Sequence, residues 1–319
     1  MYSVGIDLGG TNIAIGLCDK DLKIIDKLSI PTFSERGPAS IVKDMASLTE
    51  KIISKNNLAI SDIDFVGIAA PGSVDSVTGI IGASNNIKMY DFPMVEEFKK
   101  HIRIENVYIA NDANAAALGE ALCGAGRGTK SSVMVTLGTG VGGGVVLDGK
   151  LFAGGLNSFG AELGHIVISA GGEPCTCGRR GCFEAYSSAT ALIRMTKKKI
   201  SELKEKNIFS PLVDAEKLDG KISGKTAFKF SKEGDIYAKE VVDDYVRYLS
   251  CGITNLINIF QPEVLAIGGG ISNEPSLLLP VTEIVNREQY TKDEKIKTRV
   301  VIATLKNDAG IIGAAALGR

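Results

Sequence analysis

The sequence has no excess of charge of either sign, and it lacks a long apolar run. Its 36 basic residues are balanced by 37 acidic ones, which gives a formal net charge of −1. This balance supplies no basic field for nucleic acid or for an anionic membrane surface. No stretch approaches the roughly 20 apolar residues of a membrane-spanning helix, and the N-terminal MYSVGIDLGG lacks the features of a signal peptide. We therefore expect a soluble cytosolic protein without nucleic-acid or membrane partners.

Cysteine and histidine are scarce and unevenly placed. The chain has six cysteines and two histidines, yet Cys175, Cys177 and Cys182 stand within eight positions, and nine residues separate His165 from Cys175. One imidazole and three thiolates complete the tetrahedral shell of structural zinc. A reducing cytosol disfavours a disulfide, so redox-active or unligated thiols are the alternatives. The other cysteines have the apolar neighbours of core residues: Cys18, Cys123 and Cys251.

The internal organisation begins with a repeated plan. Segments 3–19 and 133–149 each run from an apolar strand through a Gly/Thr-rich turn into a second apolar strand. Each predicts a β-hairpin, because glycine tolerates the positive φ angles of a tight turn. The copies start about 130 residues apart, which favours two related halves in a two-domain chain. Glycine-rich hairpins that arose independently are the alternative.

The rest of the pattern alternates strands with helices. Helices are predicted after Pro38 and over about 235–260, where apolar residues recur every three or four positions up to Pro262. We therefore expect an α/β fold with a largely parallel sheet and hairpins at its edges. The lysine-rich stretch 197–235 shows little apolar periodicity and is expected to be a solvated excursion. Apolar strands open four further segments: 65–72, 107–122, 264–272 and 300–305.

The glycine turns have the composition of phosphate-binding loops. Backbone N–H groups bind phosphate oxygens, and glycine lets the chain approach them closely. Each turn alone also fits a structural hairpin, and neither is a Walker loop. A third glycine cluster at a strand end, 268–270, nevertheless favours a phosphate site at the carboxyl ends of the strands. Asp7 precedes the first turn and can hold Mg²⁺ or its water shell. The predicted cofactor-binding residues are Asp7, Gly9, Gly10, Thr11, Asn12, Gly138, Thr139, Gly140, Gly268, Gly269 and Gly270.

Four polar side chains stand where a substrate rich in hydroxyl groups could be held. Asn111 and Asp112 follow an apolar strand and precede an alanine-rich helix. Asp112 can accept the proton of an attacking hydroxyl while Asn111 holds the same substrate, unless one of them simply caps the helix. Glu162 and Glu184 bracket the cysteine cluster. They can accept hydrogen bonds from the hydroxyls of a sugar, or they are ordinary surface glutamates.

Together these motifs resemble those of the ROK family of sugar kinases and sugar-responsive repressors, within the actin/hexokinase/Hsp70-like ATPase superfamily. They correspond to the family's first phosphate motif, connecting segment, second phosphate motif, the two parts of its sugar and zinc signature, and its adenosine motif. The resemblance covers nearly the whole chain and is carried, in this order, by DLGGTN (7–12), NDANAAALGE (111–120), TLGTGVGGG (136–144), AELGHI (161–166), CTCGRRGCFEAYSS (175–188) and IGGGIS (267–272).

The resemblance implies two actin-like (ribonuclease H-like) α/β domains with a cleft between them. The first would span 1–118, joined by the C-terminal helix at about 307–319. The second would span 119–306 and carry the zinc-binding loop 165–182. The resemblance also implies Mg²⁺-assisted transfer of the γ-phosphoryl group of ATP to a hexose hydroxyl, with Asp112 as the base. A homodimer or homotetramer is expected from the family alone.

The resemblance further assigns ligands to the sugar and to zinc. At Asn86 the sequence departs from the family, because Asn85 replaces the usual proline. Zinc would be bound by His165, Cys175, Cys177 and Cys182. The sugar would be held by Gly72, Asn86, Asn111, Asp112, Glu162, His165 and Glu184.

Glucose is the expected substrate, because the sugar and zinc signature and the connecting segment look most like those of bacterial glucokinases. An N-acetylmannosamine or N-acetylglucosamine kinase is the alternative, followed by a fructose or allose kinase. Specificity among these sugars is expected to lie in the loops around 72–90 and 152–160. A sugar-responsive repressor is a remote alternative, since repressors carry a helix-turn-helix domain before the first phosphate motif, which here starts almost at Met1.

Overall fold

The computed structural model describes residues 1–155 and 158–319, so two residues of the loop 152–160 lie outside the described residues. Contacts divide the chain into two units. Unit 1 comprises 1–132, 144–161 and 304–319, and unit 2 comprises 133–143 and 162–303. The division into domains 1–118 and 119–306 stays a prediction.

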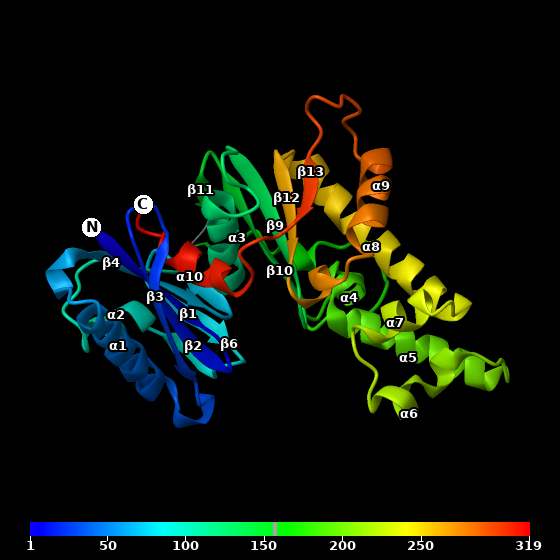
Figure 1. The fold of residues 1–319 in the computed structure, drawn as a ribbon, viewed down its shortest axis with the longest axis horizontal. Helices are drawn as coiled ribbons and strands as arrows, with labels where there is room; N and C mark the ends of the chain where they lie inside the picture. The colour runs from blue at the N-terminus through cyan, green and yellow to red at the C-terminus, as the bar shows by residue number, and fades with distance from the viewer. Residues whose placement is uncertain (156–157) are drawn as a thin grey trace. The chain divides into compact units, whose positions relative to one another are not determined.

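Unit 1 is built on a five-stranded sheet in the order β3-β2-β1-β4-β8 (Figure 1). Strands β1, β2 and β3 form an antiparallel meander, which confirms the first predicted hairpin, while β4 and β8 run parallel to β1. A separate antiparallel sheet has the order β5-β6-β7. These strands are β1 (Tyr2–Leu8), β2 (Asn12–Cys18), β3 (Ile24–Pro31), β4 (Ile63–Ala70), β5 (Ser73–Asp75), β6 (Ile80–Ser84), β7 (Met89–Phe92) and β8 (Val107–Asn111).

Helices cover both faces of this sheet, and β1 shows why. Its alternate residues Val4, Ile6 and Leu8 are fully buried in the core cluster that contains the apolar face of α1 (Pro38–Lys55) and residues of α2 (Met94–Lys99). The intervening residues face α10 (Ala309–Ala314): the Ser3 hydroxyl donates to the carbonyl of Ala315, the residue after this helix, at 2.9 Å. A Cβ at Gly5 would come within 2.0 Å of the Ile311 carbonyl oxygen. Glycine is therefore required where α10 lies directly on the strand. Helix α3 (Asp112–Cys123) packs beside α10.

A second five-stranded sheet has the order β11-β10-β9-β12-β13, and the boundary between the contact units crosses β9 and β10. Strands β10 and β11 are antiparallel and β12 and β13 are parallel, so a mixed sheet replaces the largely parallel one that the sequence predicted. The strands are β9 (Ser131–Leu137), β10 (Val141–Leu147), β11 (Lys150–Phe152), β12 (Val264–Gly268) and β13 (Arg299–Ile302).

The longest helix of the described residues, α8 (Ile236–Phe260), confirms the prediction for 235–260. The Asp235 carboxylate caps its start by accepting from the N–H groups of Tyr237 and Ala238, both at 2.9 Å. The helix ends at Gln261, which adopts a left-handed conformation with φ of 41° directly before Pro262. The other helices of unit 2 are α4 (Glu184–Ser187), α5 (Ala189–Glu205), α6 (Ala215–Asp219), α7 (Thr226–Lys232) and α9 (Leu278–Glu288).

The segment 197–235 differs from the sequence prediction. It contains the end of α5, the 3₁₀ helix η4 (Pro211–Asp214), α6 and α7, and it buries Leu212 and Phe230 in a satellite core. The apolar residues of this core come from elements of four to seven residues, from the loop before α7, and from α5 and α8. Elements this short do not repeat a helical period, so the pattern was invisible in the sequence. The other 3₁₀ helices are η1 (Ser34–Arg36), η2 (Ile60–Asp62), η3 (Leu163–His165), η5 (Gly270–Asn273) and η6 (Lys306–Asp308).

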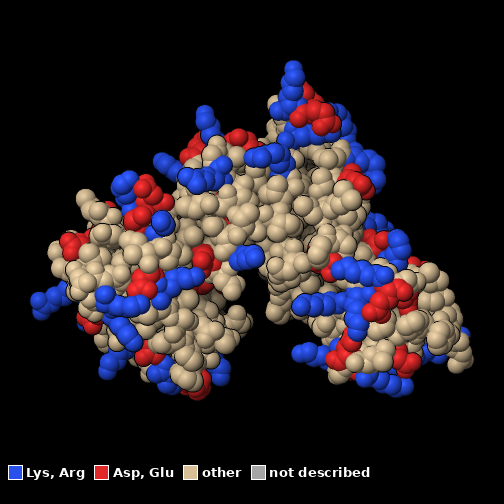
Figure 2. Space-filling view, in the orientation of Figure 1, with Lys and Arg blue, Asp and Glu red and all other residues tan. Residues whose placement is uncertain are grey.

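The surface carries charges of both signs. On the face drawn in Figure 2, lysine and arginine side chains are interspersed with aspartate and glutamate. Among the described residues, no helix is both long and apolar enough to cross a membrane.

Candidate active site

The first glycine turn joins β1 to β2 in unit 1. The Gly9 N–H donates to the Asn12 carbonyl at 2.9 Å. Thr32 directly follows β3, and the sequence did not indicate its role because it lies outside the turn. Its hydroxyl donates to the Gly9 carbonyl at 2.6 Å, and its N–H donates to the Thr11 carbonyl at 2.8 Å. Thr32 therefore holds the carbonyls of Gly9 and Thr11 in place, while Gly10, Thr11 and Asn12 are exposed. The predicted phosphate ligands of this turn lie together.

Two carboxylates lie close together in unit 1. Burial and the neighbouring Asp112 raise the pKa of Asp7 to about 6. The surrounding protein also raises the pKa of Asp112 by desolvation, although hydrogen bonds, including one from the Ala113 N–H, oppose the shift. Asp112 nevertheless has an exposed side chain, so its carboxylate is partly desolvated but reachable. A pair of this kind suits a cation ligand beside a general base.

Asn111 has the structural role that the sequence left open. Its Oδ1 caps α3 by accepting from the N–H groups of Ala113 and Asn114 at 2.9 and 3.2 Å. Its Nδ2 donates to the Gly72 carbonyl at 3.0 Å. Both ends of the amide are thus anchored, and Asp112 occupies the first helical position, where the N-terminal N–H groups favour a carboxylate.

Two further sugar candidates, Gly72 and Asn86, lie next to these groups. Gly72 has φ of 99°, and a Cβ there would come within 2.1 Å of the Ala83 carbonyl oxygen, so the position requires glycine. Asn86 lies opposite the first glycine turn, since a Cβ on Gly10 would be 3.6 Å from the Asn86 Cβ. Unit 1 therefore gathers the predicted Asp7, Gly72, Asn86, Asn111 and Asp112 around the ends of β1, β4 and β8.

The second glycine turn joins β9 to β10 and is held by the segment that follows the cysteines. The Ala189 N–H donates to the Gly138 carbonyl at 2.8 Å, and the Thr190 hydroxyl donates to the Thr139 carbonyl at 2.7 Å. The Val141 N–H donates to Glu184 Oε2 at 3.0 Å. The sequence did not predict the contact of Thr190 with the turn, because Thr190 lies 51 positions after Thr139 in the chain.

The third glycine cluster lies beside the second turn. A Cβ at Gly269, where φ is 85°, would come within 2.5 Å of the Leu137 backbone nitrogen at the end of β9. Next to this cluster is a cavity of about 520 Å³ with both apolar and basic walls. The sequence analysis missed the wall contributed by 224–233, because it treated that stretch as solvated. The lining residues are Gly224, Lys225, Phe228, Lys229, Lys232, Glu233, Gly270, Ile271, Asn273 and Glu274.

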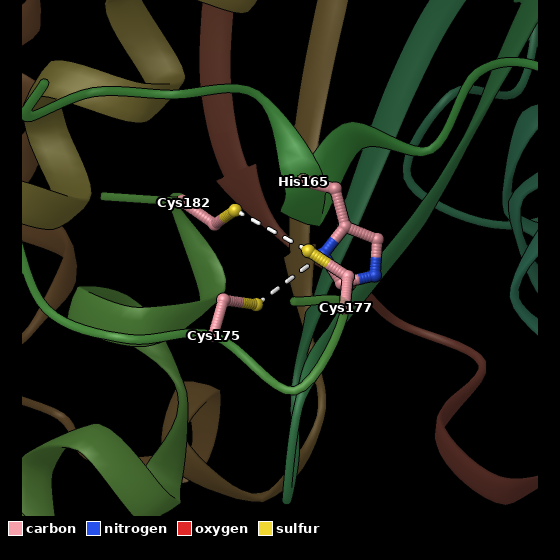
Figure 3. A group of neighbouring side chains, drawn as sticks. All are labelled: His165, Cys175, Cys177 and Cys182. Atoms are coloured by element: carbon pink, nitrogen blue, oxygen red, sulfur yellow. Dashed lines mark hydrogen bonds between the residues drawn. The ribbon is translucent and has the colours of Figure 1, made fainter. Parts of the chain in front are cut away.

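The structure brings the predicted metal ligands of unit 2 together. The ligand atoms of His165, Cys175, Cys177 and Cys182 all lie within 4.8 Å of one another, and Figure 3 shows the sulfurs and the imidazole converging. The Sγ atoms of Cys177 and Cys182 are 3.7 Å apart, and Cys175 Sγ is 3.6 Å from His165 Nδ1. A tetrahedral ion with metal–sulfur bonds of about 2.3 Å needs S···S edges of roughly 3.8 Å. The four side chains therefore fit a closed four-coordinate metal site.

Burial also affects the ionisation of one of these thiols. Burial raises the pKa of the Cys182 thiol to about 12, so its sulfur is an anionic ligand at neutral pH only with a metal beside it. His165 presents Nδ1 to the cluster from the end of η3.

The two predicted glutamates differ in environment. Glu162 is exposed and precedes η3, where its carbonyl accepts from the His165 N–H at 3.0 Å. Glu184 is half-buried and begins α4. Its Oε1 accepts from the Thr176 hydroxyl at 3.1 Å and lies 3.6 Å from Cys175 Sγ. Glu184 therefore contacts both the cysteine loop and the second glycine turn, which the sequence did not reveal.

Comparison with known proteins extends this picture. Residues 3–319 match the ROK family model. The chain is 38% identical over 315 residues to the glucokinase of Halalkalibacterium halodurans, spanning 98% of this chain and 93% of that one. It is also 38% identical over 320 residues to the glucokinase of Thermotoga maritima, with coverages of 98% and 96%. A ROK family glucokinase from Streptomyces griseus, crystallised with glucose and AMPPNP, superposes with a TM-score of 0.78 at 31% identity over 99% of each chain. The chain therefore belongs to the ROK family, as its motifs predicted.

Proposed function

We propose that the chain is an ATP-dependent glucokinase, which transfers the γ-phosphoryl group of ATP to the 6-hydroxyl of glucose. The observation that carries the proposal is the pair Asp7 and Asp112, which lie close enough for one to raise the pKa of the other beside the first glycine turn. Full-length identity of 38% to glucokinases supports the same activity. The relative crystallised with glucose and AMPPNP supports both substrates.

Asp112 is the proposed general base. It accepts the proton of the 6-hydroxyl as the new oxygen–phosphorus bond forms, the bond from the γ-phosphorus to the bridging oxygen breaks, and ADP leaves with the electron pair. Its raised pKa makes it a stronger base than an ordinary aspartate. The anchored Asn111 fixes the start of α3, and with it the position of Asp112.

The nucleotide is proposed to bind through the three glycine clusters. Backbone N–H groups of the two turns suit the phosphates, and the cavity beside Gly270 and Phe228 has the size and the mixed lining expected for an adenosine group. Mg²⁺ would neutralise the phosphate charge when bound near Asp7, the carboxylate directly before the first turn.

Zinc is the proposed metal of the cysteine and histidine cluster, because three thiolates and one imidazole are its typical structural shell. The closed shell leaves no position for a substrate, so the proposed role is to fix the loop that carries Glu162, His165 and Glu184. These three side chains, with Gly72, Asn86 and Asn111, are the proposed partners of the sugar hydroxyls.

A coupled assay of ADP release with glucose, N-acetylmannosamine, N-acetylglucosamine, fructose and allose tests the proposal. We expect the highest kcat/KM with glucose. A higher value with another sugar would replace glucose as the substrate, and no ADP release above the sugar-free rate with any of them would overturn the kinase assignment.

A further inference from the structure

Glu184 contacts both the second glycine turn and the cysteine loop. One carboxylate oxygen, Oε2, accepts the Val141 N–H of the second glycine turn at 3.0 Å. The other, Oε1, accepts the Thr176 hydroxyl of the cysteine loop at 3.1 Å. Because the two oxygens belong to one carboxylate, Glu184 links the cysteine loop directly to the second glycine turn.

The position of Thr176 depends directly on the metal cluster. It stands between two of the four ligands, Cys175 and Cys177, and Glu184 itself follows the ligand Cys182 by two residues. A metal bound by these sulfurs would therefore fix both ends of the Thr176–Glu184 hydrogen bond. The loop tip is also held by hydrogen bonds from the Cys175 N–H to the Arg179 carbonyl at 2.9 Å, from the Gly178 N–H to the Cys175 carbonyl at 3.0 Å, and from Arg179 Nη1 to the His165 carbonyl at 3.2 Å.

The turn is built to receive this carboxylate. A Cβ on Gly140 would lie 2.3 Å from Glu184 Oε2, so glycine at this position makes room for Glu184. The neighbouring Gly138 N–H is already donated to the Gly140 carbonyl at 3.0 Å. With Gly138 and Val141 both committed, the conformation of the turn determines how the N–H groups between them point.

We infer that Glu184 is a positioning residue that couples metal occupancy of the cysteine and histidine cluster to the conformation of the second glycine turn, and through it to nucleotide affinity. The nucleotide part rests on the proposed function; the effect on the turn does not. Both contacts are made within unit 2 by groups of this chain, a backbone N–H and a threonine hydroxyl.

The test measures two quantities without sugar: ADP affinity by calorimetry, and hydrogen–deuterium exchange of peptides that contain Val141. Wild type is compared with Glu184→Ala, Thr176→Val, Glu184→Gln and the control Glu173→Gln, each zinc-loaded and after chelation. Glu173 lies on the same loop but pairs with Arg194 at 3.8 Å.

We expect chelation to weaken ADP binding of the wild type and of Glu173→Gln about tenfold and to speed exchange at Val141, since a charge-assisted hydrogen bond is lost. Glu184→Ala should show both effects with zinc bound and should no longer respond to chelation. Thr176→Val, which keeps Glu184 and all four ligands, should lose the response to zinc. Glu184→Gln can keep both contacts, because its amide oxygen can accept from Val141 and its NH₂ can donate to Thr176, but it lacks the charge. Its ADP affinity and its exchange at Val141 should therefore lie between those of the wild type and of Glu184→Ala.

Zinc content and circular dichroism of each variant establish that it is folded and loaded. Exchange at Val141 that is equal in zinc-loaded and chelated wild type would overturn the inference and leave the kinase proposal standing. If exchange at Val141 responds to chelation as expected but the protein does not bind ADP, the nucleotide part of the inference and the kinase proposal are both overturned. A zinc-loaded Glu184→Ala variant that binds ADP and exchanges at Val141 as the wild type does would also overturn the inference.

Discussion

The carboxylate of Glu120, near the end of α3, accepts a hydrogen bond from the Leu305 N–H at 2.6 Å. The Ala125 N–H and the Thr304 hydroxyl donate to the same carboxylate at 2.8 and 3.3 Å. The chain re-enters unit 1 at Thr304, and Glu120 is only 2% exposed. A single buried side chain thus holds the segment that returns from unit 2.

Glu120→Ala should destabilise the protein by about 3 kcal/mol, because three donors lose their acceptor in a buried place. Urea denaturation followed by circular dichroism measures the change. Glu50→Ala, at an exposed position of α1, is the control and should cost no more than about 0.5 kcal/mol. Equal midpoints for the two variants would contradict this role of Glu120.

Asp112→Asn should lower kcat by roughly a thousandfold, because the amide cannot accept the hydroxyl proton. Glucose and ADP affinities, measured by calorimetry, should stay close to those of the wild type, and so should the melting temperature. The exposed Asp64→Asn serves as the control. An unchanged kcat would remove Asp112 from the role of base.

Purified protein should contain about one zinc per chain by elemental analysis. Cys177→Ser should reduce the zinc content and lower the melting temperature, since it removes one of four ligands from a site that stabilises its own loop. Cys251→Ser, outside the cluster, should retain its zinc. Metal-free wild type with an unchanged melting temperature would argue against the site.

Asp235 gives stability that depends on pH. Burial raises its pKa, but hydrogen bonds from Ser210 and from the N–H groups of Ala238, Leu212 and Tyr237 outweigh burial and hold the pKa below the ordinary value of 3.8. The folded state therefore favours the ionised form, so the stabilisation is complete above pH 3.8 and is lost as the pH decreases through the folded pKa.

Asp235→Ala should accordingly cost about 2 kcal/mol at pH 7, and the difference from wild type should shrink as the pH decreases below 3.8. Guanidinium denaturation at pH 7 and at pH 3 measures it. Asp243→Ala, which removes an exposed carboxylate from the same helix, should have a small effect. A cost that is the same at both pH values would show that the ionised form is not what stabilises α8.

What the sequence could predict depended on how local the signal is. The start and end of α8 were predicted because the apolar stripe is long and Pro262 stops it. The metal ligands were predicted because three of four lie within eight residues. The contact between Val141 and Glu184 could not be predicted, since it joins residues 43 apart through a backbone N–H that leaves no side-chain pattern. The packing of 197–235 was also missed, because its core is assembled from elements too short to show a period.

The glycines of the first sheet have a consequence for how the protein is made. Gly5 on β1 and Gly67 on β4 leave room for the backbone of α10, with ideal Cβ positions only 2.0 and 1.8 Å from its carbonyl oxygens. During synthesis these strands leave the ribosome some 240 residues or more before residues 309–314 are added. The part of the sheet that α10 covers thus stays bare until the polypeptide is nearly finished. A nascent chain stalled before residue 309 should therefore expose this face to chaperones and proteases.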